Sequence, residues 1–142
     1  MTLVVDASVA MKWYLLEDGA DSARQILAGG KTLVAPELVV AEVCSGSWIA
    51  YRRREITATQ QGRIAADIAC VFDRLESLVH HSSRAAAIAR ELDHAAYDCF
   101  YLAVSEALDA PLVTVDGRLL AKVAGTRFAA RTLGLNDYTP RN

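Results

Sequence analysis

Two short apolar segments that each lead into an aspartate constrain the fold of this chain most. Residues 3–5 precede Asp6, and residues 112–115 precede Asp116. A third apolar segment covers residues 33–35. Short, partly β-branched apolar runs are typical of buried strands. Because the segments between these strands have helical spacing and exceed a minimal crossover, we expect a parallel sheet that helices cover on both faces.

Apolar spacing, capping residues and breakers predict the helices. A chain of 142 residues should form a single domain, residues 1–142. Two long amphipathic helices in succession suggest an exposed helical arm. No secondary structure is predicted after residue 125. The expected helices cover residues 7–16, 20–28, 37–54, from Thr57 or Thr59 to about 80, from Ser82 or Ser83 to about 92, 97–108 and 117–123.

Composition and charge exclude several classes of protein. The N-terminus has no basic region and carries Asp6, so export is not expected and a cytoplasmic protein follows. No apolar run reaches the roughly 18 residues that a membrane span needs. The net charge of -2 means that nucleic acid could bind only through a local basic patch. Cys44, Cys70 and Cys99 lie far apart in apolar patterns, which predicts buried thiols rather than a disulfide or zinc site.

Four carboxylates stand where a negative charge is costly. Asp6 and Asp116 end two strands, and the carboxyl ends of neighbouring parallel strands meet at one edge of a sheet. Glu42 is the only polar residue in residues 38–44, and Asp98 interrupts an apolar helix. Unpaired charges in apolar surroundings cost several kcal/mol. A divalent cation would neutralise the group, and all-oxygen ligands suit Mg²⁺ or Mn²⁺ rather than zinc.

Each of these acids also has a structural explanation when it is considered alone. Asp6 between a strand and a helix is a good N-cap, and Asp116 before a glycine forms a common turn. Glu42 would fit on a narrow polar stripe of its helix. Asp98 would be favoured by the helix dipole in a first turn. The four acids together are therefore more informative than any one of them.

The four acids lie in three sequence segments. The order and spacing of these segments are more specific for a protein family than any one segment alone. They are Val4-Val5-Asp6-Ala7-Ser8; Pro36-Glu37-Leu38 through Ala41-Glu42-Val43; and Tyr97-Asp98-Cys99-Phe100-Tyr101-Leu102-Ala103 followed by Leu112-Val113-Thr114-Val115-Asp116 and Leu119. In these segments the chain resembles the PIN-domain ribonucleases, and among them the VapC-type toxins of bacterial toxin–antitoxin pairs. The resemblance implies a three-layer α/β/α fold, RNA cleavage that depends on Mg²⁺ or Mn²⁺, a homodimer, and an antitoxin protein that covers the site.

The resemblance also implies roles for individual residues. The acidic quartet of the active site would be Asp6, Glu42, Asp98 and Asp116, and Ser8 and Thr114 would support these acids. As a mechanism, the three aspartates would hold one metal ion, while Glu42 would bind a second ion or orient the attacking water. Some relatives carry a further acid shortly after the last of the four. This chain has Gly117-Arg118-Leu119 there, so it has no acid at these positions that could be a ligand of a second ion.

Two groups of arginines are candidates for contacts with RNA phosphates, because guanidinium groups recognise phosphate in a bidentate manner. One group is Arg52, Arg53 and Arg54, and the other is Arg118 beside Asp116. The first group has an alternative explanation, because cations at a helix C-terminus complement the helix dipole. The amphipathic segment of residues 57–80 is a candidate surface for a partner helix.

Other functions are consistent with parts of the sequence. A PIN-like module that has lost catalysis and binds RNA or protein is the main alternative. A phosphotransferase of the haloacid-dehalogenase type would need a second aspartate where this chain has Ser8. A purely structural α/β protein would leave two of the acids unexplained. His80, His81 and His94 have no metal-ligand spacing, and the tryptophans and tyrosines are expected in the core or at an interface.

Overall fold

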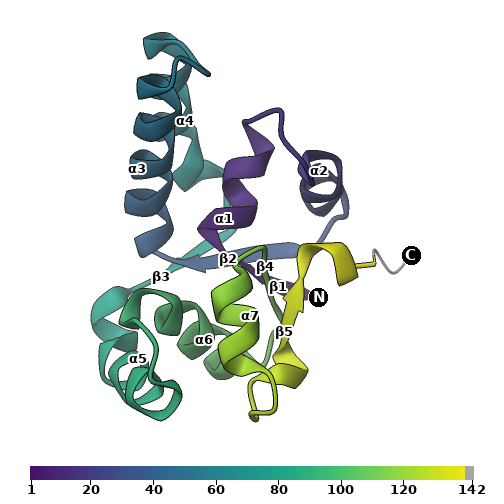
Figure 1. Ribbon diagram of the computed structural model, residues 1–142, viewed down its shortest axis with the longest axis vertical. Coiled ribbons are helices and arrows are strands. Elements are labelled where there is room, and N and C mark those ends of the chain that lie inside the picture. Colours follow the sequence, from purple (N-terminus) through teal and green to yellow (C-terminus); the bar gives the residue numbers. More distant parts are fainter. Residues whose placement is uncertain (140–142) are drawn as a thin grey trace.

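The computed structural model describes residues 1–139, and its centre is a five-stranded parallel sheet (Figure 1). The strand order is β3-β2-β1-β4-β5. The strands are β1 (Thr2–Val5), β2 (Thr32–Pro36), β3 (Arg74–Glu76), β4 (Leu112–Thr114) and β5 (Thr132–Gly134). Strands β1, β2 and β4 confirm the three predicted from apolar runs, whereas β3 and β5 were not predicted.

Helices cover both faces of the sheet, as expected. From β1 the chain steps in one direction to β2 and β3, and from β3 it returns past β1 to β4 and β5. Because such connections are right-handed, this reversal places α1–α4 on one face and α5–α7 on the other (Figure 1). The three-layer prediction is confirmed. The helices are α1 (Ala7–Ala10), α2 (Ala20–Ala28), α3 (Leu38–Arg52), α4 (Ala58–Val71), α5 (Leu78–Leu92), α6 (Ala96–Leu108) and α7 (Gly117–Val123), with 3-10 turns at Met11–Trp13, Ala129–Arg131 and Leu135–Asp137.

The prediction of one helix up to residue 80 was wrong. Helix α4 ends at Val71, and Phe72 adopts an extended conformation. The buried Phe72 ring packs against Trp13, with 5.6 Å between the ring centroids, and the chain then forms β3 beside β2. The next helix begins at Leu78, with Ser77 as its N-cap, and not at residue 82. A strand of three residues is too short for an alternating pattern to identify it.

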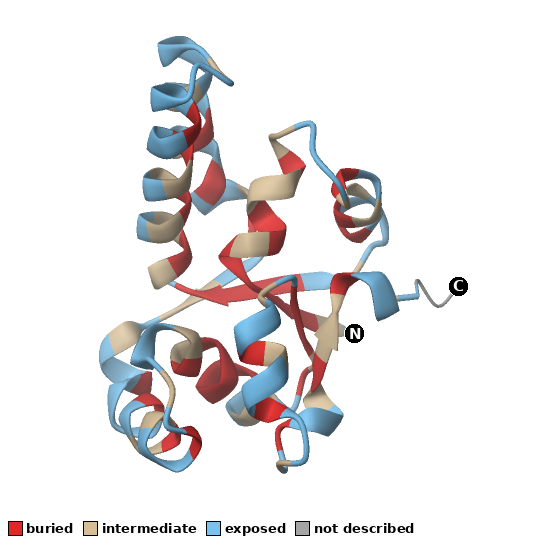
Figure 2. Cartoon of the chain, in the orientation of Figure 1, coloured by how far each residue is buried: buried red, intermediate tan, exposed pale blue. Residues whose placement is uncertain are grey.

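The predicted helical arm is the antiparallel pair of α3 and α4, which extends beyond the sheet (Figures 1 and 2). Thr57 starts α4 through a capping box: its hydroxyl accepts from the Gln60 N–H at 3.1 Å, and the Gln60 side chain accepts from the Thr57 N–H at 2.7 Å. Figure 2 shows that the far end of this arm is largely exposed. In residues 1–139, no helix is long and apolar enough to cross a membrane.

The prediction of buried cysteines is confirmed only for Cys99. Cys44 is half-buried and Cys70 is exposed. On α4 the buried face is formed by Ile64 and Ile68, and Cys70 lies away from that face. An apolar pattern locates the buried side of a helix less sharply when alanines occupy both sides, as they do in α4.

Candidate active site

The strand order reverses between β1 and β4, and this point of the sheet edge gathers side chains of the candidate site. The two strands pair in parallel, with Val5 opposite Val113, and the Asp6 N–H donates to the Val113 carbonyl at 3.1 Å. Asp6 follows β1 directly, and Asp116 follows β4. Ligand sites of parallel sheets lie outside the carboxyl ends of the strands at such a reversal. The structure therefore places Asp6 and Asp116 at one edge, as the strand pattern predicted.

Hydroxyl groups hold the Asp6 carboxylate in one orientation. Its Oδ2 accepts from Ser8 Oγ at 2.6 Å and from Thr114 Oγ1 at 2.7 Å. The same hydroxyls accept backbone N–H groups of the second strand end, from Val115 to Ser8 at 3.2 Å and from Asp116 to Thr114 at 3.0 Å. Ser8 and Thr114 thus link the ends of β1 and β4 around Asp6.

The acids of the site repel one another, and none of them pairs with a lysine or arginine among residues 1–139; Asp98 contacts only His94. Burial raises the pKa of Asp6 above its usual range, and the neighbouring Asp98 and Asp116 raise it further, against the hydrogen bonds that it accepts. Burial also raises the pKa of Glu42 to about 7, with added repulsion from Asp6 and Asp98. This mutual repulsion indicates that all four predicted acids belong to one cluster.

Tyr101 orients Glu42 and was missed by the sequence analysis, which assigned the tyrosines to the core or to an interface. Glu42 lies in α3, and the fully buried Tyr101 of α6 donates its hydroxyl to Glu42 Oε1 at 2.8 Å. The hydrogen bond therefore joins the helices of the two faces at the sheet edge. Its position three residues after Asp98, on the same face of a helix, was the available signal.

His94 contacts Asp98 in the same way that Tyr101 contacts Glu42, through one polar side-chain atom. Its Nε2 lies 2.6 Å from Asp98 Oδ2, at the start of α6. The histidines have no metal-ligand spacing in the sequence, and this pair was not predicted. A histidine four residues before a carboxylate, just ahead of a predicted helix, is the signal that could have identified it.

Each of the four carboxylates has one oxygen that accepts a protein hydrogen bond and one that does not, within residues 1–139. Asp116 uses Oδ1 to cap α7 through two N–H groups. In the same residues no fully buried polar side-chain atom lacks a partner, so the free oxygens reach solvent. The free oxygens are Asp6 Oδ1, Glu42 Oε2, Asp98 Oδ1 and Asp116 Oδ2.

This donor set fits a hard divalent cation such as Mg²⁺ or Mn²⁺, which prefers carboxylate oxygens. Among the described residues, no three ligand-type side chains already surround one point. Repulsion between uncompensated carboxylates keeps such groups apart, and a bound cation would offset that repulsion. The residues therefore fit the predicted metal by chemistry, and ligation would require side-chain adjustments.

The predicted arginine contacts lie in two separate places. Arg118 is exposed in the first turn of α7, two residues after Asp116. Arg52, Arg53 and Arg54 are at the opposite end of α3 from Glu42, about 15 Å along a helix that rises about 1.5 Å per residue. The structure therefore brings Arg118 beside the acids and leaves the other three at the end of the arm.

Removing the Tyr101 hydroxyl should shift the pH dependence of metal binding. The Tyr101 hydrogen bond lowers the pKa of Glu42, so Tyr101→Phe should raise that pKa further. A hydrogen bond to a charged group contributes about 1.5–3 kcal/mol, which corresponds to one unit of pH or more. We expect the midpoint of Mn²⁺ binding, measured by calorimetry between pH 5 and 9, to move upward by about one unit. An unchanged midpoint would show that Glu42 takes no part in binding.

Three comparisons place this geometry among known proteins. The family model described as the PIN domain matches residues 3–126. A ribonuclease VapC3 from Pyrobaculum aerophilum is 27% identical over 124 residues, which cover 86% of this chain and 95% of that protein.

Two solved structures have a similar fold. A toxin–antitoxin complex from Klebsiella pneumoniae contains a chain with a TM-score of 0.67 and 16% identity, covering 99% of this chain and 98% of that one. A chain of VapBC2 from Rickettsia felis, in a structure with a promoter DNA fragment, has a TM-score of 0.58 and 15% identity, covering 94% and 98%.

Proposed function

The chain belongs to the PIN domain family, and on that premise we propose that it is a Mg²⁺- or Mn²⁺-dependent endoribonuclease, the VapC-type toxin of a type II toxin–antitoxin pair. One observation supports the catalytic part most strongly. Four carboxylates without a lysine or arginine partner among residues 1–139 lie near the reversal of strand order, and each keeps one oxygen open to solvent. Such a group is costly to a purely structural protein and useful to one that binds cations.

Asp6, Asp98 and Asp116 would hold the metal ion through their free oxygens. A bound divalent ion supplies a more acidic water and neutralises charge that develops on the phosphate. Ser8 and Thr114 keep Asp6 Oδ2 occupied, so Oδ1 is the oxygen that would be available to the ion. The two hydroxyl groups thus position a metal ligand. Because water is the nucleophile, the reaction needs no serine or histidine nucleophile.

Glu42 would contribute in one of two ways: it binds a second ion, or it takes the proton of the attacking water. A carboxylate whose pKa is about 7 is suited to accept a proton near neutral pH. Water oxygen then bonds to phosphorus while the bond from phosphorus to the leaving ribose oxygen breaks. Tyr101 holds the accepting carboxylate in place.

Metal binding by wild type and Asp98→Asn tests this proposal. At 100 times its dissociation constant, Mn²⁺ should stabilise the wild type by about 2.7 kcal/mol and raise its melting temperature by several degrees. Asp98→Asn should lose both the calorimetric signal and the thermal shift, together with cleavage of RNA. Asp109→Asn is the matched control, because Asp109 is an exposed helix-ending residue with φ of 47°, a conformation that asparagine tolerates.

Failure of the wild type to bind Mn²⁺ would refute the catalytic proposal. The alternative, a catalytically inactive PIN-like module that binds RNA or protein, would then be favoured. If Asp98→Asn instead unfolded, Asp98 would be a structural acid. The pairing of binding with melting temperature separates these results.

The proposal extends to partners and organisation. The Klebsiella pneumoniae neighbour is described as a toxin–antitoxin complex and the Rickettsia felis neighbour as VapBC2, which supports an antitoxin protein as the partner of this chain. We also propose a homodimer, which sedimentation measurements would test. One cluster of buried side chains extends from Leu3 to Leu135, which supports the treatment of residues 1–142 as a single domain.

A further inference from the structure

A hollow of about 570 Å³ lies beside the acid cluster, between residues 93–95, which precede α6, and one face of α7. Helix α6 carries Asp98, and α7 begins directly after Asp116. The hollow is therefore bounded by the segment before α6 and by α7, next to the helix starts where Asp98 and Asp116 lie. Its lining residues are Asp93, His94, Ala95, Arg118, Ala121 and Lys122.

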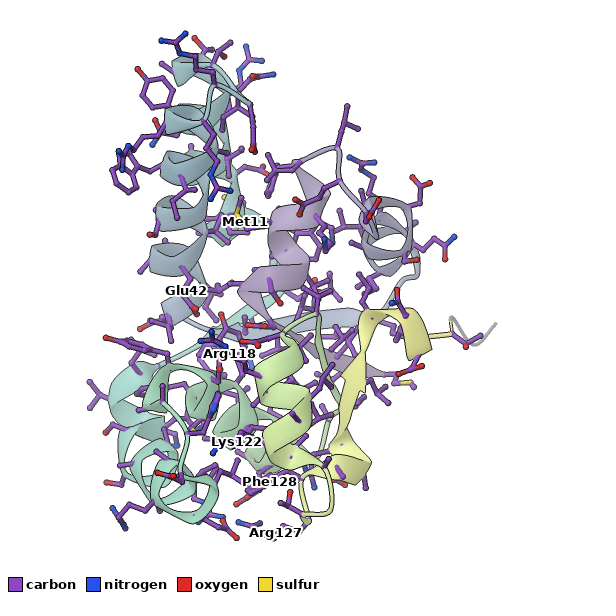
Figure 3. All side chains as sticks on the ribbon, viewed as in Figure 1. Met11, Glu42, Arg118, Lys122, Arg127 and Phe128 are labelled. Carbon is purple, nitrogen blue, oxygen red and sulfur yellow. The ribbon has the colours of Figure 1, made fainter. Side chains whose placement is uncertain are left out.

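The hollow has two cationic side chains that the described part of the chain does not neutralise. Arg118 and Lys122 are four residues apart on α7, so they share one face, and both are exposed. Neither makes an ion pair within residues 1–139, whereas Arg84 and Arg127 bind Glu106. Figure 3 shows Arg118 between Glu42 and Lys122, so Lys122 lies farther from Glu42 in this view than Arg118 does.

His94 connects this hollow to the acid cluster. It lines the hollow, and its Nε2 lies 2.6 Å from Asp98 Oδ2. A ligand in the hollow would thus contact the residue that positions Asp98. Asp93 is the one carboxylate of the lining, so the cationic groups outnumber it.

We propose that this hollow binds the RNA phosphate adjacent to the one that is cleaved, through Arg118 and Lys122, with His94 as the positioning residue at the boundary. The inference rests on the proposed function, because the acids define where the cleaved phosphate lies. The two cations lie one helical turn, about 5.4 Å, apart along α7, so both can contact the same phosphate. Guanidinium and ammonium groups along a groove are typical of binding to a single-stranded backbone.

Binding of a fluorescein-labelled, single-stranded RNA of 12 nucleotides tests the hollow, with EDTA present to prevent cleavage. Fluorescence anisotropy at several salt concentrations should show about fivefold weaker binding for Lys122→Gln, and a salt dependence whose slope is smaller by about 0.7. Lys122→Arg should restore both. Arg24→Gln is the matched control, because Arg24 is a partly exposed arginine of α2 whose ion pair with Asp21 is 3.8 Å long.

Mn²⁺ affinity and melting temperature should be unchanged in Lys122→Gln, because the residue binds no other side chain among residues 1–139. If the wild type binds Mn²⁺ and cleaves RNA but Lys122→Gln has a wild-type slope, the hollow proposal is overturned and the proposed function stands. If the slope falls but no variant binds Mn²⁺, the hollow is supported and the proposed function fails. Competition by a decaglutamate peptide that depends on Lys122, without RNA binding, would identify an acidic protein segment as the ligand and overturn the inference.

Discussion

Replacing Asp6 by asparagine should abolish Mn²⁺ binding, reduce RNA cleavage by at least about 100-fold, and raise the melting temperature of the metal-free protein. The Asp6 side chain is 4% exposed, and no cation offsets its charge among residues 1–139. Asparagine has the same shape, and its oxygen can still accept from Ser8 and Thr114. The substitution therefore removes the negative charge that metal binding requires. It also removes the repulsion between Asp6 and the neighbouring carboxylates, which destabilises the metal-free protein.

The pH dependence of this stabilisation has a defined sign. Burial raises the pKa of Asp6 in the folded protein above its unfolded value, so the stability that this residue contributes is present below that unfolded value, near 3.8. It is lost as the pH rises through the folded pKa. The advantage of Asp6→Asn over wild type should therefore grow from pH 4 to pH 8, when both proteins are melted in EDTA. Each kcal/mol would correspond to about 3–4 °C.

An opposite result would change the interpretation of the site. If Asp6→Asn melted below the wild type at pH 8 and lost its near-ultraviolet circular dichroism, Asp6 would be needed for folding. Thr114→Val is an informative companion, because it removes one hydrogen bond to Asp6 and leaves the charge. It should destabilise the metal-free protein, in contrast to Asp6→Asn.

Phe128→Ala should lower the free energy of unfolding by about 3–5 kcal/mol and the melting temperature by about 10–15 °C. Phe128 is 1% exposed, and the Arg127 guanidinium lies 4.1 Å from its ring centroid. Its backbone carbonyl also accepts from Thr132 Oγ1 at 2.9 Å, at the start of β5. Loss of the ring would leave a cavity where the segment after α7 joins the core.

Urea unfolding at 25 °C measures this effect, with Phe128→Leu as the control that keeps most of the apolar volume. The leucine variant should lose no more than about 1.5 kcal/mol. Figure 3 shows Phe128 and Arg127 at the end of α7 away from Glu42, so the alanine variant should still bind Mn²⁺ below its melting temperature. A loss under 1 kcal/mol for Phe128→Ala would mean that the last strand contributes little to the fold.

Much of the fold and the four acids could be predicted because their signals are local. The runs at residues 3–5, 33–35 and 112–115 are apolar and bounded by breakers or charges, so each identifies a buried strand. Glu42 and Asp98 stand out because carboxylates are rare in apolar helical patterns. The helical arm follows from two consecutive amphipathic segments, although its second helix ends earlier than predicted.

Strands β3 and β5 could not be predicted because each is a three-residue segment at an edge of the sheet without the apolar run that identifies β4. Such segments have too few residues for an alternating pattern, and pairing with β2 or β4 decides their conformation. The prediction that Cys70 is buried was wrong for a related reason. An alanine-rich helix has no sharp apolar face, so its neighbours decide which side is covered.

The sequence by itself therefore determined the central strands and the covering helices and singled out the four candidate acids, because hydrophobic periodicity and misplaced charges are properties of short segments. Only the tertiary structure decided how these acids are oriented and what lies beside them. The bond from Tyr101 to Glu42 joins residues 59 positions apart, and the bond from Thr114 to Asp6 joins residues 108 apart. These contacts exist because the strand order reverses between β1 and β4, which brings distant segments to one edge of the sheet.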